Sequence, residues 1–334
     1  MRILTLLLLL ISGFSTHAQR QKYSFTQPKM GSPFNIVAYA EDSTALEKAV
    51  QKAYNFVDTL NAIFSDYSET SEISVLAKTY KIHEWVSISP QLWTVLKISQ
   101  AAALESDGAF DVSVGNIVKL WRKVRKEKRK PQAESLKIAL SKTGFQHFEI
   151  EGKIPKIRFF TEGVLLDFGG IVKGYAAQEV VGILTEAGFT SCFADAGGDL
   201  AFGNKPPDKA HWSIGVTLPN SENHLFERLL LLENRAIATS GDMYNFTEIG
   251  SVRYSHIVNP KTGMGVTHQR NVTIIAKDGA TADWLATACS VLTPKKALKL
   301  VKHYPEAALL IVENRKGKIK MWQSRRLSRY YAPF

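Results

Sequence analysis

Apolar residues follow helical spacing in some parts of the chain and form short strand-like clusters in others. Leu46, Val50, Val57 and Phe64 belong to a row with helical spacing, which predicts an amphipathic helix opened by a capping box at Thr44 and Glu47. Ser89-Pro90 predicts the start of a second helix. Further helices are expected over 173–187, ending at Gly188, and over 281–292. Strands are expected over 34–40, 163–167, 191–196, 212–218, 229–232, 271–276 and 307–312.

The order of these segments predicts the fold class. Helices and strands alternate along only part of the chain, and strand pairs typical of hairpins lie between them. This order favours an α+β fold, with a mixed sheet core and flanking helices, over a doubly wound parallel sheet.

The first eighteen residues have the pattern of a secretory signal. Arg2 precedes an apolar stretch of twelve residues, and small residues before Gln19 offer a cleavage site. The stretch is too short to span a bilayer comfortably, although an uncleaved anchor is an alternative. No cysteine follows it, so no lipid-modified terminus is expected. We therefore expect a signal peptide over 1–18 and one extracytoplasmic domain over 19–334, in the periplasm or on the outer face of the cytoplasmic membrane.

Composition excludes several classes of protein. The 334 residues are 45% hydrophobic and 22% charged, and the mean hydropathy is −0.10. These values exclude a disordered chain, a collagen-like chain and a multi-span membrane protein. The two cysteines, Cys192 and Cys289, are too few for a disulfide scaffold. Both lie in apolar surroundings, which favours two buried thiols over a disulfide.

The net charge of +11 is concentrated in two basic segments. Residues 119–130 and 314–334 carry +7 each, which leaves the rest of the chain at −3. We expect 119–130 to be an exposed loop or helix end. Each segment is interpreted as a solvated surface or as a contact for an anionic membrane or acidic partner. No nucleic-acid partner is expected, because no recognised nucleic-acid motif accompanies the charge.

One glycine-rich turn combines a carboxylate with a cation. Asp167 ends a predicted strand, Gly169 and Gly170 follow it, and Lys173 lies in the first turn of the next helix. Helix N-terminal amides beside a lysine suit phosphate oxygens, although a purely structural turn is the alternative. The segment is neither a P-loop nor a dinucleotide-binding fingerprint.

Two further segments carry candidate ligands and a candidate base. Asp283 and Thr287 are four residues apart and share one face of a predicted helix, where a carboxylate and a hydroxyl suit a hard cation such as Mg²⁺ or Ca²⁺. His256 is a candidate general base, with a structural histidine as the alternative.

Two predicted loops suit a planar ring. Tyr67 lies in a polar loop after the first helix, and Gly108 permits a tight turn before Phe110 and Asp111. Phe110 is a candidate for stacking on a ring, and Asp111 for accepting its hydrogen bonds. The alternatives are a capped helix end and an ordinary turn.

Together these clusters occur in an order that resembles the FAD:protein FMN transferase family, often called the ApbE family. The resemblance covers nearly all of the expected mature chain. The matching stretches are MGS at 30–32, FSDYSETSEIS at 64–74, DGAFDVSVG at 107–115, LDFGGIVKGYA at 166–176, DAGGDL at 195–200, ATSGD at 238–242, YSHIVNPKTG at 254–263 and TADWLATA at 281–288.

The resemblance implies a fold, a reaction and a set of partners. It implies a tunnelling-fold-like α+β core and Mg²⁺-dependent transfer of the FMN half of FAD onto a Thr or Ser hydroxyl, with release of AMP. It implies acceptors that are flavoprotein subunits of membrane redox complexes. A Mg²⁺-dependent FAD pyrophosphatase and a non-catalytic flavin-binding protein are the alternatives.

The resemblance also implies roles for particular residues. His256 matches the proton acceptor, and Gly170, through its carbonyl, matches the metal site with Asp283 and Thr287. The flavin contacts that it implies are Met30, Tyr67, Ala109, Phe110, Asp111, Asp167, Lys173 and Ile257. The chain departs from the family pattern at Ala77, at Asp195 and in the basic segment 119–130, which bears on the choice of partner more than on the chemistry.

Overall fold

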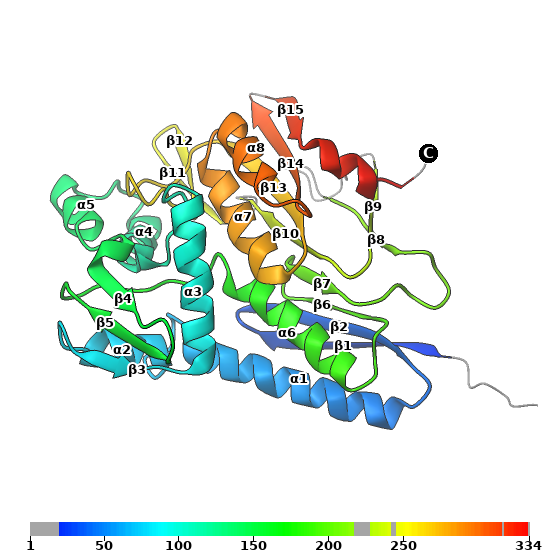
Figure 1. Ribbon diagram of the computed structural model, residues 1–334. Coiled ribbons are helices and arrows are strands. Elements are labelled where there is room, and N and C mark those ends of the chain that lie inside the picture. The colour runs from blue at the N-terminus through cyan, green and yellow to red at the C-terminus, as the bar shows by residue number, and fades with distance from the viewer. Residues whose placement is uncertain (1–19, 217–227, 242–244, 316, 333–334) are drawn as a thin grey trace, which may run out of the picture.

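The centre of the molecule is one large antiparallel sheet. The structure, a computed structural model, describes residues 20–216, 228–241, 245–315 and 317–332 (Figure 1). In this part of the chain the main sheet has eight strands, and each pair of neighbours is antiparallel. Across the sheet the strands are β1 (Gln21–Lys29), β2 (Ser32–Ala40), β6 (Cys192–Asp195), β7 (Leu200–Phe202), β10 (Ala236–Ser240), β13 (Gln269–Ala276), β14 (Ala308–Arg315) and β15 (Lys318–Gln323).

Helices cover one face of this sheet. Alternate residues of β2, Phe34, Ile36 and Ala38, are fully buried in the cluster that also holds the apolar sides of α1, α6 and α7. Figure 1 shows these three helices crossing the same face of the sheet. The helices of the described residues are α1 (Ser43–Phe64), α2 (Glu72–Thr79), α3 (Pro90–Glu105), α4 (Gly115–Glu127), α5 (Ala133–Leu140), α6 (Val172–Glu186), α7 (Gly279–Val291) and α8 (Pro294–Lys302).

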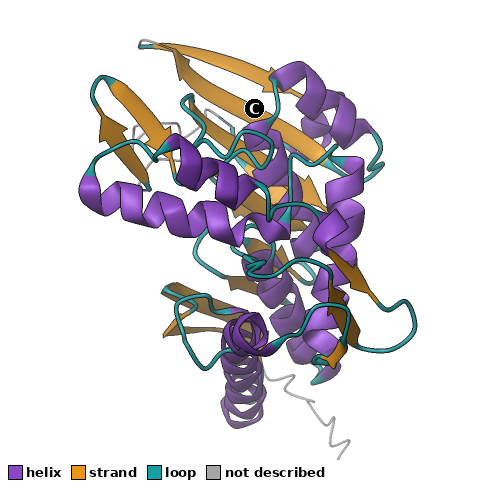
Figure 2. Cartoon of the chain, turned by 90° about the vertical axis from the view of Figure 1, so that its left-hand side faces the viewer, coloured by secondary structure: helices purple, strands orange, loops and turns teal. Residues whose placement is uncertain are grey.

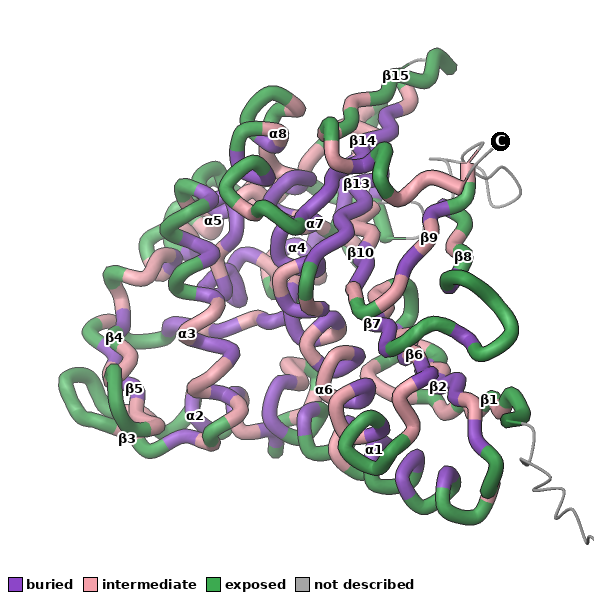
Figure 3. Tube along the Cα trace, turned by 45° about the vertical axis from the view of Figure 1, so that its right-hand side comes forward, coloured by how far each residue is buried: buried purple, intermediate pink, exposed green. Residues whose placement is uncertain are grey.

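Smaller elements cover the opposite face. Val37, on the other side of β2, belongs to a second core cluster with β8 (Trp212–Ile214), β9 (Leu230–Leu232) and the 3₁₀ turn η3 (Arg325–Tyr330). The inner strands β13 and β14 are therefore buried on both faces, whereas β15 at the edge is largely exposed (Figure 3). The described helices and sheets form the α+β fold that the sequence predicted.

A third group of elements lies beside the helical layer. Helix α4 packs on the hairpin of β11 (Phe246–Ile249) and β12 (Val252–Ser255) in a third core cluster. Figure 2 faces the side of the molecule that carries these elements. A small sheet and two further 3₁₀ turns complete the described elements: β3 (Trp85–Ser87), β4 (Phe148–Ile150), β5 (Lys156–Phe159), η1 (Val112–Val114) and η2 (Phe145–His147).

Most predicted elements are present, with shifted ends. Helix α3 begins at Pro90, as predicted, and the Ser89 hydroxyl caps it by accepting a hydrogen bond from the Leu92 amide. Strand β1, which pairs with β2 along its whole length, was not predicted. Both cysteines are buried and free, as expected. The predicted signal at 1–18 and the end of the predicted strand 212–218 lie outside the described residues.

Two local predictions are wrong. The capping box is replaced by Asp42, whose Oδ1 accepts hydrogen bonds from the amides of Thr44 and Ala45, because the helix begins two residues earlier than predicted, at Ser43. Val164 and Leu166 are buried, but residues 163–167 form no ladder, because Leu165 and Asp167 bond the backbone around η1 instead.

The basic segment 119–130 forms the end of α4 and the residues after it, and most of it is at least partly exposed, as predicted. Its two buried residues, Trp121 and Val124, lie on one side of the helix.

No helix in the described ranges is both long and apolar enough to cross a bilayer.

Candidate active site

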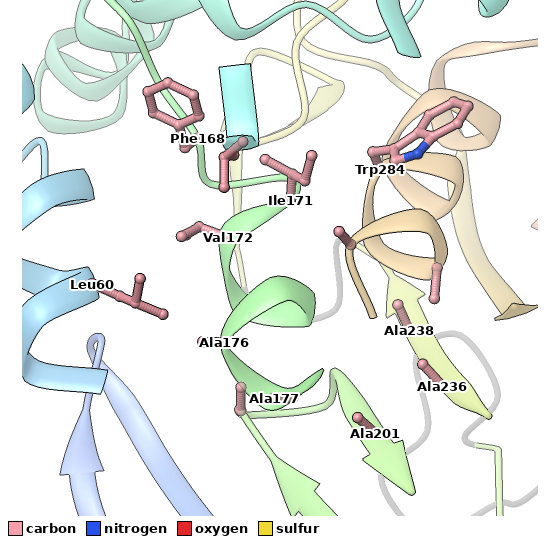
Figure 4. Packing of buried hydrophobic residues seen from close by; sticks show 14 of the residues in the cluster. Leu60, Phe168, Ile171, Val172, Ala176, Ala177, Ala201, Ala236, Ala238 and Trp284 are labelled. Carbon is pink, nitrogen blue, oxygen red and sulfur yellow. The ribbon is translucent and has the colours of Figure 1, made fainter. Parts of the chain in front are cut away.

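Two glycines bring α6 and α7 into direct backbone contact. A Cβ atom placed on Gly174 would lie 2.1 Å from the carbonyl oxygen of Gly279, and one placed on Gly279 would lie 1.9 Å from that of Gly174. Asp283 lies one turn after Gly279 on α7, and its Oδ2 accepts a hydrogen bond of 3.1 Å from the Gly174 amide. The crossing therefore places a carboxylate against the first turn of α6. Figure 4 shows the start of α6, after Phe168 and Ile171, beside Trp284 of α7.

The other proposed metal ligands lie at the same crossing. A Cβ on Gly170 would lie 2.8 Å from Oγ1 of Thr287, so the turn before α6 touches the same face of α7 that carries Asp283. Oγ of Ser240, at the end of β10, lies 3.3 Å from Oγ1 of Thr287. The structure thus brings Gly170, Asp283 and Thr287 together from segments more than one hundred residues apart in sequence.

The Asp283 carboxyl group is held in an unfavourable environment for a negative charge. Burial raises the pKa of Asp283 to about 7, although the Gly174 amide and the charge of Lys173 act in the opposite direction. Asp199, in the turn between β6 and β7, lies close enough to interact with it. Burial, and then the charge of Asp283, raise the pKa of Asp199 well above its usual range. Two carboxyl groups therefore share one buried region.

This donor set fits a hard divalent cation. Carboxylate, hydroxyl and carbonyl oxygens are the ligands that Mg²⁺ and Ca²⁺ prefer, and a cation offsets the repulsion between two buried carboxylates. Within the described ranges, no three His, Cys, Asp or Glu side chains group as a metal site. The fit therefore depends on Asp283 and Asp199 together with the oxygens of Thr287 and Gly170.

Lys173 connects this region to the turn after β6. It lies in the first turn of α6, and its Nζ would be 3.5 Å from a Cβ placed on Gly197. Its charge acts on Asp199, Asp283 and His256. An ammonium group beside the open amides of a helix start is a suitable site for phosphate oxygens.

His256 is oriented with one ring nitrogen free to accept a proton. Its Nδ1 lies 3.0 Å from the carbonyl oxygen of Asn245, so Nδ1 carries the hydrogen and Nε2 is the acceptor. Desolvation by the surrounding protein lowers the pKa of His256 below its usual value, and the charges of Arg125 and Lys173 lower it further, although part of the side chain is exposed. The imidazole is therefore neutral at physiological pH, as a general base requires.

A second pair of carboxyl groups lies on the other side of the glycine turn. Burial and the charge of Asp66 raise the pKa of Asp167 to about 6. Arg122 of α4 donates a hydrogen bond to Asp66, and its Nη2 is 3.8 Å from Oδ2 of Asp167. Tyr67, which follows Asp66, is 80% exposed, as a residue that contacts a ligand would be.

The remaining predicted flavin contacts differ in exposure. Phe110 is buried, and its ring centroid lies 6.1 Å from that of Trp284. The ring therefore packs into the core in this structure, and its contact with a flavin stays a prediction. Ala109 is buried too, and Oδ1 of Asp111 accepts two hydrogen bonds from Ser113. A ligand would meet this loop mainly through its backbone.

Met30 and Ile257 lie on turns. Met30 has a φ of 50°, at the turn between β1 and β2. Ile257 is half-buried, and its amide bonds the Ser255 hydroxyl. Asp242, in the predicted 238–242 motif, lies outside the described residues.

Sequence reasoning gave no role to Asp66, Asp199 or Arg122. Asp199 directly follows the pair Gly197-Gly198, and a charged residue close behind a Gly-Gly pair was the available signal. Arg122 was grouped with a surface charge run, and nothing local distinguishes it from the neighbouring lysines. An open groove of about 520 Å³ between α1 and α6 holds none of the predicted site residues.

Comparison with known proteins decides the family. The model of the ApbE family matches residues 30–311. The chain belongs to the ApbE family. A relative named FAD:protein FMN transferase from Vibrio cholerae serotype O1 is 29% identical, covering 93% of this chain and 92% of the relative. A relative of the same name from Treponema pallidum is 26% identical, covering 93% of this chain and 90% of that protein.

Solved ApbE structures have the same fold. The apo form of the flavinyl transferase ApbE from Pseudomonas stutzeri superposes with a TM-score of 0.83 at 27% identity, covering 94% of this chain and 98% of that chain. The ApbE protein from Thermotoga maritima gives a TM-score of 0.83 at 29% identity, covering 94% of this chain and 100% of that chain. This chain is therefore similar to ApbE proteins along nearly its whole length.

Proposed function

We propose that this chain is a flavin transferase that moves the FMN half of FAD onto a Thr or Ser hydroxyl of an acceptor flavoprotein. The observation that carries the proposal is the contact between α6 and α7, which places Asp283 and Thr287 beside the Gly-Gly turn and Lys173 in an ApbE protein. The relatives named FAD:protein FMN transferase support the same activity.

The reaction exchanges the phosphoanhydride bond of FAD for a phosphate ester bond on the acceptor. The acceptor oxygen attacks the FMN phosphorus of FAD, and the bond from that phosphorus to the bridging oxygen breaks. AMP leaves with the bridging oxygen, and FMN remains on the acceptor as a phosphodiester. Nε2 of His256 takes the hydroxyl proton, a contribution of roughly 10²–10⁴-fold.

The other site residues bind and neutralise the pyrophosphate. Lys173 and the amides at the start of α6 supply positive charge to its oxygens. Asp283, Thr287 and the Gly170 carbonyl, with Asp199 beside them, would hold Mg²⁺ here. When bound, this ion would withdraw electrons from the phosphate oxygens. On the flavin side, the isoalloxazine ring would lie near Met30 and Tyr67, with the 109–111 loop opposite.

The experiment that tests this proposal incubates the protein with FAD, Mg²⁺ and a Thr-bearing acceptor flavoprotein. A covalently yellow acceptor that gains the mass of one FMN, with one AMP released, is expected. Free FMN and AMP without labelled acceptor would instead identify an FAD pyrophosphatase, in which water replaces the acceptor hydroxyl. FAD recovered unchanged would identify a binding protein without catalysis.

We also propose that the protein works outside the cytoplasmic membrane, on flavin-carrying subunits of membrane redox complexes. The N-terminal pattern supports export, and the exposed lysines of α4 support contact with an anionic lipid surface. Fractionation of expressing cells should recover a mature chain that begins near Gln19 and leaves the membrane in a high-salt wash. An intact N-terminus in the cytoplasmic fraction would contradict export, and retention after the wash would contradict an electrostatic contact.

A further inference from the structure

One arginine of the basic helix α4 belongs to the interior of the site rather than to its surface. Trp121, the preceding residue, is 2% exposed, and its Nε1 donates a hydrogen bond of 2.7 Å to the Gly263 carbonyl. Its ring also packs on that of Tyr254, with the ring centroids 5.1 Å apart. These contacts fix the rotation of α4 about its axis, and Arg122 consequently faces the loops that carry Tyr67 and Asp167.

Arg122 joins two loops that are one hundred residues apart in sequence. Its Nη2 bonds Asp66 in the loop after α1, and lies 3.8 Å from Asp167 in the turn before α6. The side chains of Arg122 and Asp66 are each 26% exposed, and that of Asp167 is 14% exposed. Pairs at this depth are less screened than surface pairs, so these contacts order both loops.

The same guanidinium group supports the exposed tyrosine. The Arg122 guanidinium carbon lies 4.1 Å from the centroid of the Tyr67 ring. A flat, delocalised cation stacks on an aromatic face in a way that an ammonium group cannot reproduce. Because Tyr67 is 80% exposed, the rest of its ring is open to a ligand.

The arrangement is not one that stability alone would favour. Within the part of the chain that the structure describes, Nε of Arg122 is buried and has no hydrogen-bond partner. A buried donor without a partner is destabilising. Its Nη2 already bonds Asp66 and lies near Asp167, so Arg122 is not a free binder of phosphate either. The role left for Arg122 is to hold the Tyr67 ring in position.

We propose that Arg122 is the positioning residue of the flavin site, holding the Tyr67 ring and the Asp66 and Asp167 loops in the arrangement that receives the isoalloxazine ring. The proposal rests on the proposed function, because it presupposes that FAD binds here. Arg122 touches protein groups only and acts through Tyr67. Its loss therefore weakens FAD binding more than it slows transfer from bound FAD.

The test measures the FAD dissociation constant by flavin fluorescence, with a chelator present so that FAD is not consumed. The variants are Arg122→Ala, Arg122→Lys and Lys123→Ala. Lys123 is the matched control, because it is the next residue of α4, carries the same charge, and is 71% exposed with its Nζ 3.8 Å from Glu127. We expect Arg122→Ala to weaken binding by about 10-fold or more, and Lys123→Ala to change it by less than about twofold.

Three further results separate positioning from general damage. Arg122→Lys should recover only part of the affinity, because lysine restores the positive charge but not the planar guanidinium group. The transfer rate at saturating FAD should change far less than the dissociation constant. In a Tyr67→Ala background, Arg122→Ala should weaken binding little further, because the two residues act as one unit.

Two outcomes would overturn the proposal without touching the proposed function. The first is FAD affinity in Arg122→Ala equal to that of the parent. The second is full recovery in Arg122→Lys, which would reduce the effect to charge and which decides the question if Arg122→Ala does not fold. A parent protein that fails to bind FAD would instead refute the proposed function itself.

Discussion

Replacing Asp283 with asparagine is expected to reduce FMN transfer by about 10³-fold, the scale on which losing one group that stabilises transition-state charge acts. The asparagine oxygen can still accept the hydrogen bond from the Gly174 amide, so the α6–α7 contact should persist. What is lost is a negative charge beside Asp199, and with it the affinity for a divalent cation. Transfer assayed across a Mg²⁺ titration, with a thermal melt of the same sample, measures both effects.

Thr287 supplies the matched comparison for this variant. Thr287→Ser keeps the hydroxyl that lies beside Gly170 and should retain most of the activity, whereas Thr287→Val keeps the shape and should lose it. Hydrolysis of FAD to FMN and AMP should fall in parallel with transfer in Asp283→Asn, because both reactions break the same bond. Parental rates in Asp283→Asn with a chelator present would refute the assignment of a cation to this crossing.

Replacing His256 with alanine is expected to reduce transfer by roughly 10²–10⁴-fold while FAD still binds. In the proposed mechanism the imidazole takes a proton from the acceptor hydroxyl. Most groups proposed to hold FAD lie on other segments, and the exception is the neighbouring residue Ile257. Single-turnover transfer, together with the FAD dissociation constant, separates the two effects. A parental transfer rate in this variant would show that the base lies elsewhere.

The same histidine predicts the pH dependence of the reaction. A general base works in its unprotonated form, and the pKa of His256 is lowered, so kcat/KM should hold as the pH falls to about 6.5, the usual value for histidine, and decline below it. Arg125 is one cause of the lowering. Arg125→Gln should therefore move the decline toward higher pH, and an unchanged profile would contradict this electrostatic role.

Local pattern was sufficient to predict much of the fold. Helix α1 shows its apolar side directly in the sequence, from Leu46 to Phe64, and Ser89-Pro90 marks the start of α3. The strand expected at 163–167 shows where pattern fails. Buried apolar residues are needed for a core strand, but whether a ladder forms depends on a neighbouring strand, and here the backbone bonds a turn instead.

The candidate site was predictable where chemistry is carried by residues close in sequence, and through the family resemblance elsewhere. The spacing of Asp283 and Thr287 is visible on one helix. The interaction of Asp283 with Asp199 is not, because it depends on how α7 crosses the sheet. The position of Arg122 depends on Trp121 reaching Gly263, more than one hundred residues away. The burial of Phe110 could not be predicted, because a ring suited to a ligand is equally suited to the core.

The backbone contact between Gly174 and Gly279 fixes the distance between α6 and α7. Neither partner has a side chain that could rotate to absorb a shift, so a displacement of one helix is passed on to the other. The proposed cation site and the proposed pyrophosphate site would consequently both depend on this one distance. We therefore expect differences in acceptor choice to depend on the peripheral loops and α4, where a change in shape leaves this distance unchanged.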